Sequence, residues 1–320
     1  MILTDYFESK PNRQWELAKQ VGVNHAVVRL PETPDFDETN YFHWKQVFDE
    51  FEKWEIKPVV LEPIPNCIHD HIKRGDDRRD ECIERFLKML PIMDRLDIRV
   101  ICANFMADVG WYRTSNTVKE RGGACVAGFD IDHVSINPNF CLTQEKLWDN
   151  LERFLRAAIP DAERYGVKIA VHPDDPPVPK LQNASRILIN RASIERALKI
   201  VPSDNVGVAL CQGCYGAMGE NIYDVIEYFC KQKKVFFVHF RDVRGTAECF
   251  HETFHDNGPT DMAQAIRLYH DYGYEGPIRV DHVPTMAGEE NHKPGYELIG
   301  RLFAIGYLKG LLDASGYDYI

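Results

Sequence analysis

The chain has 320 residues, 44% hydrophobic and 27% charged, which is the composition of a globular enzyme with a large core. Its 49 acidic and 38 basic residues give a formal net charge of −11, which argues against nucleic acid or an anionic membrane as a partner. No stretch approaches the roughly 18 apolar residues of a membrane span, and the first residues lack a secretory pattern. The nine cysteines are an odd number in apolar segments, so we expect reduced thiols and a cytoplasmic location.

Short apolar runs rich in Val, Ile and Phe alternate along the chain with amphipathic stretches of helical period, as buried parallel strands and their covering helices do. We expect strands near 2–6, 26–30, 58–62, 99–105, 168–172, 205–211, 235–240 and 277–281. Helices are expected near 12–21, 43–55, 80–96, 144–165, 191–201, 221–232, 261–272 and 296–313. Thr143 occupies a helix N-cap position, and Gly22, Gly166 and Gly273 follow expected helices, where a left-handed residue is common.

Eight strand–helix pairs favour a closed α/β barrel, the (β/α)8 TIM barrel, over an open doubly wound sheet. No linker rich in Gly, Pro or Ser divides the chain, so residues 1–320 are interpreted as a single domain. The longest irregular stretch is expected at about 114–142, after the fourth strand. Loops of this length are commonly functional lids or disordered segments.

Four consecutive strands end in potential metal ligands. These are His172, Cys211, His239 and Asp281. Because the active site of a parallel barrel lies at the carboxyl ends of its strands, the four side chains should meet on one face. Each alone could be structural, but their matched positions predict one metal site. Imidazole, thiolate and carboxylate suit Mn, Fe or Zn better than Mg or Ca.

Two further motifs point to other chemistry less strongly. The string His251-Glu252-x-x-His255 matches the zincin motif, which needs a helix, whereas a loop is expected here. We therefore disfavour a metalloprotease and expect these residues to contact a polar substrate. Cys211 and Cys214 have the spacing of a zinc knuckle or redox pair, but no second pair accompanies them.

The chain resembles the mannonate dehydratases, the UxuA family, over nearly its whole length and in the family's order. The matching strings are Asn104-Phe105-Met106, Trp111-x-Arg113-Thr114, His172-Pro173-Asp174-Asp175-Pro176-Pro177, Cys211-x-Gly213-x-Tyr215-Gly216, His239-x-Arg241, Phe250-His251-Glu252 with His255 and Asn257-Gly258, Asp281-His282, and Gly295-Tyr296 with Ile299-Gly300-Arg301. The His-Pro-Asp-Asp-Pro-Pro and Phe-His-Glu strings are quite specific to the family.

The resemblance implies a xylose-isomerase-like barrel that holds one divalent metal, Mn or Fe, and dehydrates D-mannonate to 2-keto-3-deoxy-D-gluconate in hexuronate breakdown. It places the metal ligands on the same four strand-end residues. It places the acid and the base on His282 and Tyr296, without saying which is which, for α-proton abstraction and loss of the 3-hydroxyl. Substrate contacts are expected from Asn104, Arg113, Arg241 and His251. A homo-oligomer with a sugar-acid ligand is expected.

Two departures from the family pattern bear on the substrate. Strand eight reads Asp281-His282-Val283-Pro284, where family members read Asp-His-Gly-His, and residues 114–142 are short where many members carry a long helical insertion. A metal-dependent isomerase or epimerase of an uncharged sugar stays an alternative, as does a non-catalytic barrel that binds sugar acids. Arg113 and the His251 segment favour an acidic substrate.

Overall fold

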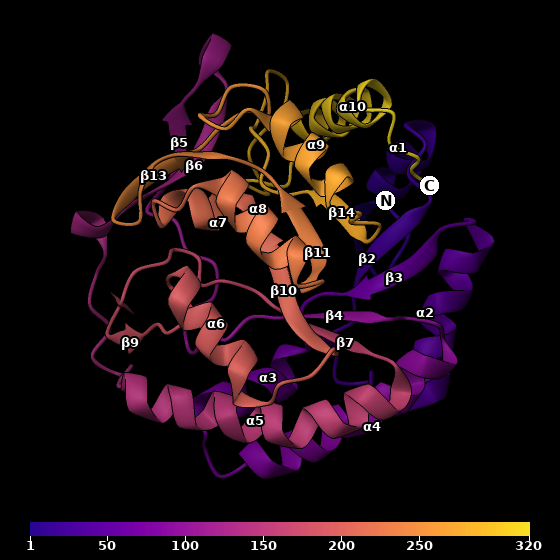
Figure 1. The fold of residues 1–320 in the computed structure, drawn as a ribbon, viewed down its shortest axis with the longest axis vertical. Coiled ribbons are helices and arrows are strands. Elements are labelled where there is room, and N and C mark those ends of the chain that lie inside the picture. The colour runs from indigo at the N-terminus through magenta and orange to yellow at the C-terminus, as the bar shows by residue number, and fades with distance from the viewer.

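Eight parallel strands close into a barrel in the computed structural model, which describes residues 1–320. The strands follow one another around the barrel in chain order, and the first pairs with the last (Figure 1). They are β1 (Ile2–Glu8), β2 (His25–Arg29), β3 (Lys57–Leu61), β4 (Val100–Ala103), β7 (Lys168–Val171), β10 (Val206–Cys211), β11 (Val235–Phe240) and β14 (Pro277–Val280). All eight expected strands are confirmed.

The eight expected helices are also present and surround the barrel (Figure 1). They are α1 (Arg13–Gln20), α2 (Tyr41–Lys53), α4 (Arg79–Arg95), α5 (Gln144–Tyr165), α6 (Arg191–Ile200), α8 (Ile222–Lys231), α9 (Met262–Asp271) and α10 (Leu298–Ala314). The Thr143 side chain caps α5 by accepting from the Lys146 N–H. Gly166 ends that helix at φ 62°, in the left-handed region that a side chain disfavours.

Two helices were not expected from the sequence. They are α3 (Asn66–Arg74) and α7 (Gln212–Ala217). Neither begins with a residue whose side chain caps it, because Pro65 and Cys211 occupy the two N-cap positions. Each is also short, so its apolar spacing gives a weak helical signal.

The pleat of the barrel strands turns alternate side chains inward and outward. Outward residues join the large core between strands and helices, whereas a small cluster fills the barrel interior: Val27, Val60, Val100, Cys102, Ala170, Ala209, Phe236 and Phe237. In six strands, the residue two positions after an interior residue has the same inward direction but lies at the barrel mouth and is polar or a thiol. These residues are Arg29, Glu62, Asn104, His172, Cys211 and His239. The same alternation that fills the barrel with apolar groups therefore delivers the functional groups above them.

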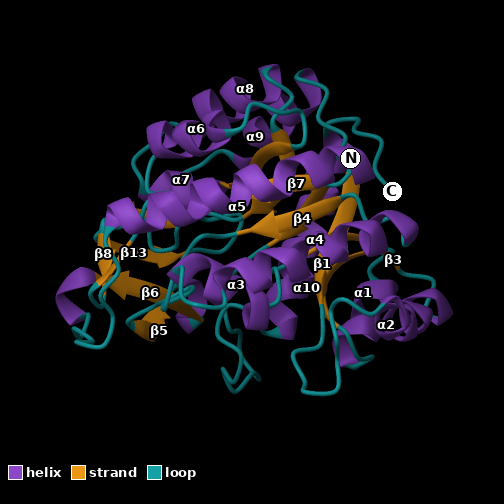
Figure 2. Cartoon of the chain, turned by 90° about the horizontal axis from the view of Figure 1, so that it is seen from below, coloured by secondary structure: helices purple, strands orange, loops and turns teal.

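The expectation of an irregular stretch at 114–142 is wrong. It contains the antiparallel strands β5 (Ser115–Lys119) and β6 (Cys125–Asp130), with the 3₁₀ turns η1 (Arg121–Gly123) and η2 (Ile131–His133). These strands join β12 (Val243–Thr246) and β13 (Cys249–Glu252) in a four-stranded sheet. Figure 2 shows β5, β6 and β13 on the side towards which the arrow of β4 points.

The small sheet forms because two distant loops bury apolar groups together. The rings of Phe129 from β6 and Phe250 from β13 lie 5.8 Å apart in an apolar cluster beneath the sheet. A shorter ribbon, β8 (Lys180–Leu181) with β9 (Ala184–Ser185), contributes Leu181 to the same cluster. The sheet could not be predicted from local periodicity, because its strands come from loops that are far apart in the sequence.

The two ends of the chain meet beside β1. The Leu3 N–H donates to the Ile320 carbonyl at 2.9 Å, and the Ile320 N–H donates to the Met1 carbonyl at 3.2 Å. None of the helices combines the length and the hydropathy that crossing a membrane requires.

Candidate active site

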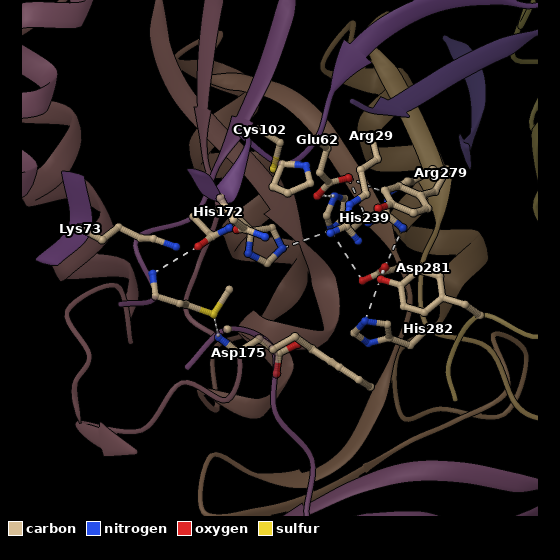
Figure 3. A pocket seen from close by; sticks show the side chains of 18 of the residues that line it. Arg29, Glu62, Lys73, Cys102, His172, Asp175, His239, Arg279, Asp281 and His282 are labelled. Atoms are coloured by element: carbon tan, nitrogen blue, oxygen red, sulfur yellow. Dashed lines mark hydrogen bonds and ion pairs between the residues drawn. The ribbon is translucent and has the colours of Figure 1, made fainter. Parts of the chain in front are cut away.

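A cavity of about 410 Å³ lies at the carboxyl ends of the barrel strands. His172, His239 and Asp281 line it together with Asn104, His282 and Tyr296, as Figure 3 shows for its labelled residues. The lining also includes Tyr6, Arg29 and Glu62, from the first three strands or directly after them. None of the three was expected from the sequence, although each lies at or near the carboxyl end of one of the first three strands, the position that identified the candidate ligands on later strands.

The candidate metal ligands lie close together around the barrel mouth. Ligand atoms of His172, Cys211 and His239 are all within 4.8 Å of one another. Cys211 and His239 are register partners on neighbouring strands, and Asp281 Oδ2 lies 3.6 Å from His239 Nδ1. All four residues are buried. The structure thus brings together the four side chains that the strand ends predicted.

The two imidazoles turn ring nitrogens towards each other, with His172 Nε2 and His239 Nδ1 3.1 Å apart. His172 Nδ1 lies 2.6 Å from the Pro173 carbonyl, to which it can only donate, so Nε2 is left as an acceptor. His239 Nε2 lies 3.1 Å from Glu62 Oε1, a close contact although it is off the line of an N–H hydrogen bond. Although burial and the Arg279 charge oppose protonation, the Glu62 and Asp281 carboxylates raise the pKa of His239 well above its usual value, so without a metal His239 Nδ1–H donates to His172 Nε2. A divalent cation that replaced this shared proton would be bound by both imidazoles.

The charges around the ligands fit a divalent cation as well. Three buried guanidinium groups, those of Arg113, Arg241 and Arg279, pair with four carboxylates, those of Glu62, Asp175, Glu252 and Asp281. Although burial disfavours a thiolate, the Cys214 thiol and the Arg241 charge hold the pKa of Cys211 well below its usual value. With the Cys211 thiolate, five negative groups face three guanidiniums and the protonated His239, and a divalent transition metal that displaced the His239 proton would neutralise the cluster.

His282 and Tyr296 lie beside the ligands at the end of β14. Because the strand ends at Val280, Asp281 and His282 are free of strict alternation, and both line the cavity. His282 Nδ1 lies 2.9 Å from Glu252 Oε1, and the His282 and Tyr296 ring centroids are 5.5 Å apart. Burial, reinforced by the Asp281 carboxylate and opposed by Arg279, raises the pKa of the Tyr296 phenol. The phenol therefore stays protonated at neutral pH.

Trp111 covers this pair at the mouth of the cavity. Its ring centroid lies 4.7 Å from that of His282, and it also packs against the Arg113 guanidinium. Over a third of its surface is exposed, so Trp111 forms part of the boundary between His282 and solvent.

Only one of the four residues expected to contact the substrate lines the cavity. Asn104 lines the cavity, whereas Arg113, Arg241 and His251 do not. Arg113 makes a bidentate ion pair with Asp175, at 2.6 and 3.0 Å, and also pairs with Glu252. Arg113 is therefore committed to protein carboxylates.

Arg241 and His251 also have protein partners. Arg241 donates to Asp281 at 2.9 Å, to Glu252 at 2.9 Å and to Asp175 at 2.7 Å. His251 Nε2, in β13, lies 3.5 Å from Oε1 of Glu120, which directly follows β5. Substrate contact by His251 stays a prediction that no contact in the structure supports.

The zincin string does not form a zincin site. His251 and Glu252 lie in β13 and His255 follows in a turn, so no helix aligns the two imidazoles. Glu252 instead lies beside Asp175 and His282. Its carboxylate forms ion pairs with Arg113 and Arg241. Cys211 and Cys214 form no disulfide with each other, and Cys214 accepts from Arg241 at 3.3 Å.

Acid should weaken this buried cluster. Although burial disfavours a carboxylate, Arg241, His282 and Arg113 hold the pKa of Glu252 at about 2, against an ordinary 4.5. Because the folded pKa is depressed, its contribution to stability is complete above the ordinary value and is lost as the pH falls towards 2. We expect the free energy of unfolding, measured with urea at about pH 6 and about pH 3, to fall less in Glu252→Gln than in the wild type. The exposed Glu84→Gln is the control, and an equal fall in all three proteins would contradict this.

Comparison with known proteins agrees with this geometry. The family model described as D-mannonate dehydratase (UxuA) matches residues 5–143 and 135–318. A mannonate dehydratase from Thermotoga maritima is 32% identical, and the alignment covers 98% of this chain and 97% of that protein. One from Streptococcus pneumoniae is 30% identical, over 92% of this chain and 87% of that protein.

Solved structures give the same result. The crystal structure of mannonate dehydratase from Streptococcus suis serotype 2 superposes with a TM-score of 0.90 at 27% identity, over 100% of this chain and 97% of that one. A xylose isomerase domain protein from Planctomyces limnophilus shares the fold with a TM-score of 0.63 at 12% identity, over 98% of both chains. The expected xylose-isomerase-like barrel is confirmed. The chain belongs to the D-mannonate dehydratase family, UxuA.

Proposed function

We propose that this chain, as a hydro-lyase of its family, converts D-mannonate to 2-keto-3-deoxy-D-gluconate and water with one divalent metal, Mn or Fe. His172, Cys211, His239 and Asp281 would hold the metal. The observation that carries the proposal is the pair of facing imidazole nitrogens, 3.1 Å apart, in a cavity that His282 and Tyr296 also line. A bound metal supplies Lewis-acid stabilisation of the negative charge that develops when the α-proton leaves.

The contacts of His282 favour it as the base. Glu252 holds Nδ1–H, which leaves Nε2 as the acceptor, as a carboxylate does in a catalytic triad. His282 removes the C2 proton and the electron pair forms the C2=C3 bond. The C3–O bond breaks as Tyr296, a neutral phenol, donates a proton so that the hydroxyl leaves as water. The enol loses its 2-hydroxyl proton and gains one at C3, which gives the 2-keto acid.

Arg241 and Arg113 would act by positioning rather than by substrate contact. Arg241 donates to the ligand Asp281 and to Glu252, while Arg113 fixes Glu252 from its other side. Both guanidiniums therefore set the orientation of the groups that hold the metal and the base. Asn104, which lines the cavity, is the one expected substrate contact that is placed to reach a ligand there directly.

Incubation of the metal-loaded protein with D-mannonate, other aldonates and hexoses tests the function. We expect a 2-keto-3-deoxy acid from D-mannonate, and loss of turnover on chelation with an unchanged circular dichroism spectrum, because the barrel core does not need the metal. This differs from small zinc domains, which unfold without it. Isomerised sugar as the product would favour an isomerase, and no turnover would favour a binding protein.

Cys211→Ala tests the metal ligands. We expect the metal content of the purified protein, measured by elemental analysis, to fall from about one per chain to a small fraction, since thiolate is the soft ligand of the set. Cys230→Ala, which removes a buried thiol from the outer core, is the matched control. Full metal retention in Cys211→Ala would contradict its assignment.

His282→Asn and Tyr296→Phe test the acid and the base. Each should keep the metal and lose at least about 10²-fold in kcat, the lower range for one proton-transfer group. If both variants turn over D-mannonate within a few-fold of the wild type, this mechanism is wrong even with the metal site intact.

Two further expectations stay predictions: assembly into a homo-oligomer, and a cytoplasmic location, with which nine free cysteines agree. Light scattering of the purified protein would test the first.

A further inference from the structure

The helix α3 presents a polar stripe to the cavity. Asn66, Asp70 and Lys73 are spaced four and three residues apart, which places them on one helical face, and all three line the cavity. The opposite face buries Ile68 and Ile72 completely. The polar face of this amphipathic helix thus lines the cavity instead of facing open solvent.

This wall is rigidly supported from behind. The Asn150 side chain of α5 donates to the Lys73 carbonyl at 3.0 Å, and Asn150 is fully buried. Gly75 ends α3 at φ 65°, and a Cβ there would lie 2.2 Å from Asn150 Oδ1, so a glycine is required at this close approach. A helix held in this way can present side chains to a ligand in fixed positions.

Lys73 has donors available for a ligand. Its side chain is 5% exposed, and its Nζ contacts one charged partner, Asp70 Oδ1, at 2.9 Å. An ammonium group offers three donors, so a buried lysine with one partner is incompletely satisfied. The side-chain nitrogen of Asn104, another cavity residue, donates to no protein group, while its oxygen accepts from the Met106 N–H at 3.3 Å.

The wall carries no net charge. Lys73 is balanced by Asp70, and on the same helix Arg74 is paired with Asp108, another cavity residue. Neutral surfaces rich in both donors and acceptors complement hydroxyl groups, which both donate and accept, better than they complement a carboxylate. Figure 3 shows Lys73 on one side of His172, with Asp281 and His282 on the other.

We infer that the α3 wall, chiefly Lys73 and Asp70, together with Asn104, binds the neutral hydroxylated tail of the substrate and selects for its length and charge. The inference rests on the proposed function, which places the reacting carbons C2 and C3 beside His282 and Tyr296. The remaining carbons then extend to the other side of the metal ligands, where α3 supplies the polar groups. Lys73 and Asp70 are specificity residues in this arrangement and take no part in proton transfer.

Substrate and side-chain truncation together test this. D-Lyxonate keeps the configuration of D-mannonate at C2 to C4 and has one tail carbon fewer. We expect Lys73→Met to lower kcat/KM for D-mannonate by about 10- to 100-fold, the range for a hydrogen bond from a charged donor. For D-lyxonate it should fall less than about threefold, because the lost donor had little to bind. Lys53→Met, at an exposed lysine of α2, is the matched control and should change neither value.

A second variant gives a gain that misfolding could not produce. Asp70→Asn leaves the Lys73 charge unbalanced, so the kcat/KM for D-mannarate, whose tail ends in a second carboxylate, should rise relative to D-mannonate by about two- to fivefold. Equal losses of Lys73→Met on both aldonates, or no rise for D-mannarate in Asp70→Asn, would overturn the inference alone. Failure of the wild type to dehydrate D-mannonate would overturn the proposed function and the inference with it.

Discussion

The alternation of side chains along eight parallel strands is the constraint on which the site depends. Closing the sheet fixes which residues face inward, and the interior is filled by small and branched groups such as Val60 and Ala209. Two residues further along, the same inward direction places Glu62 and Cys211 at the mouth. A shift of one residue in one strand would turn its ligand into the helical layer. The candidate metal ligands are therefore positioned by barrel closure itself.

A network of buried ion pairs then fixes the orientation of the side chains at the barrel mouth. Arg241 lies at its centre, in contact with Asp175, Glu252 and Asp281. A Cβ on Gly213 would lie 2.4 Å from its Nη1, so glycine leaves the room that the guanidinium needs. Removing one partner of a buried ion pair costs roughly 3–5 kcal/mol, because the other charge stays buried and unpaired. The stability of this ion-pair network is thus sensitive to the loss of any one of its residues.

The loops around the mouth divide the remaining tasks. The small sheet brings Glu252 and Arg113 together from separate loops, and the Glu252 carboxylate contacts His282. The helix α3, anchored to α5, builds the wall opposite. Under the proposed function, proton transfer and substrate selection would therefore lie on separate elements.

The barrel strands and the candidate metal ligands could be predicted from the sequence alone. The apolar runs predicted all eight strands because each is buried on both faces, and the strand ends predicted His172, Cys211, His239 and Asp281 because parallel strands bring their carboxyl ends together. The matching family strings indicated the reaction, and they implied the acid and base roles that we propose for His282 and Tyr296.

Only the tertiary structure decided which polar residues face the ligand and which face one another. Arg113 looked like a substrate clamp, yet it pairs with Asp175 and Glu252, 62 and 139 residues away in sequence. Lys73 gave no signal, because a single lysine on a short helix without a capping side chain resembles a surface residue until the barrel turns that helix towards the cavity. Local periodicity determines strands and their ends, whereas pairing across such distances depends on packing that no local pattern records.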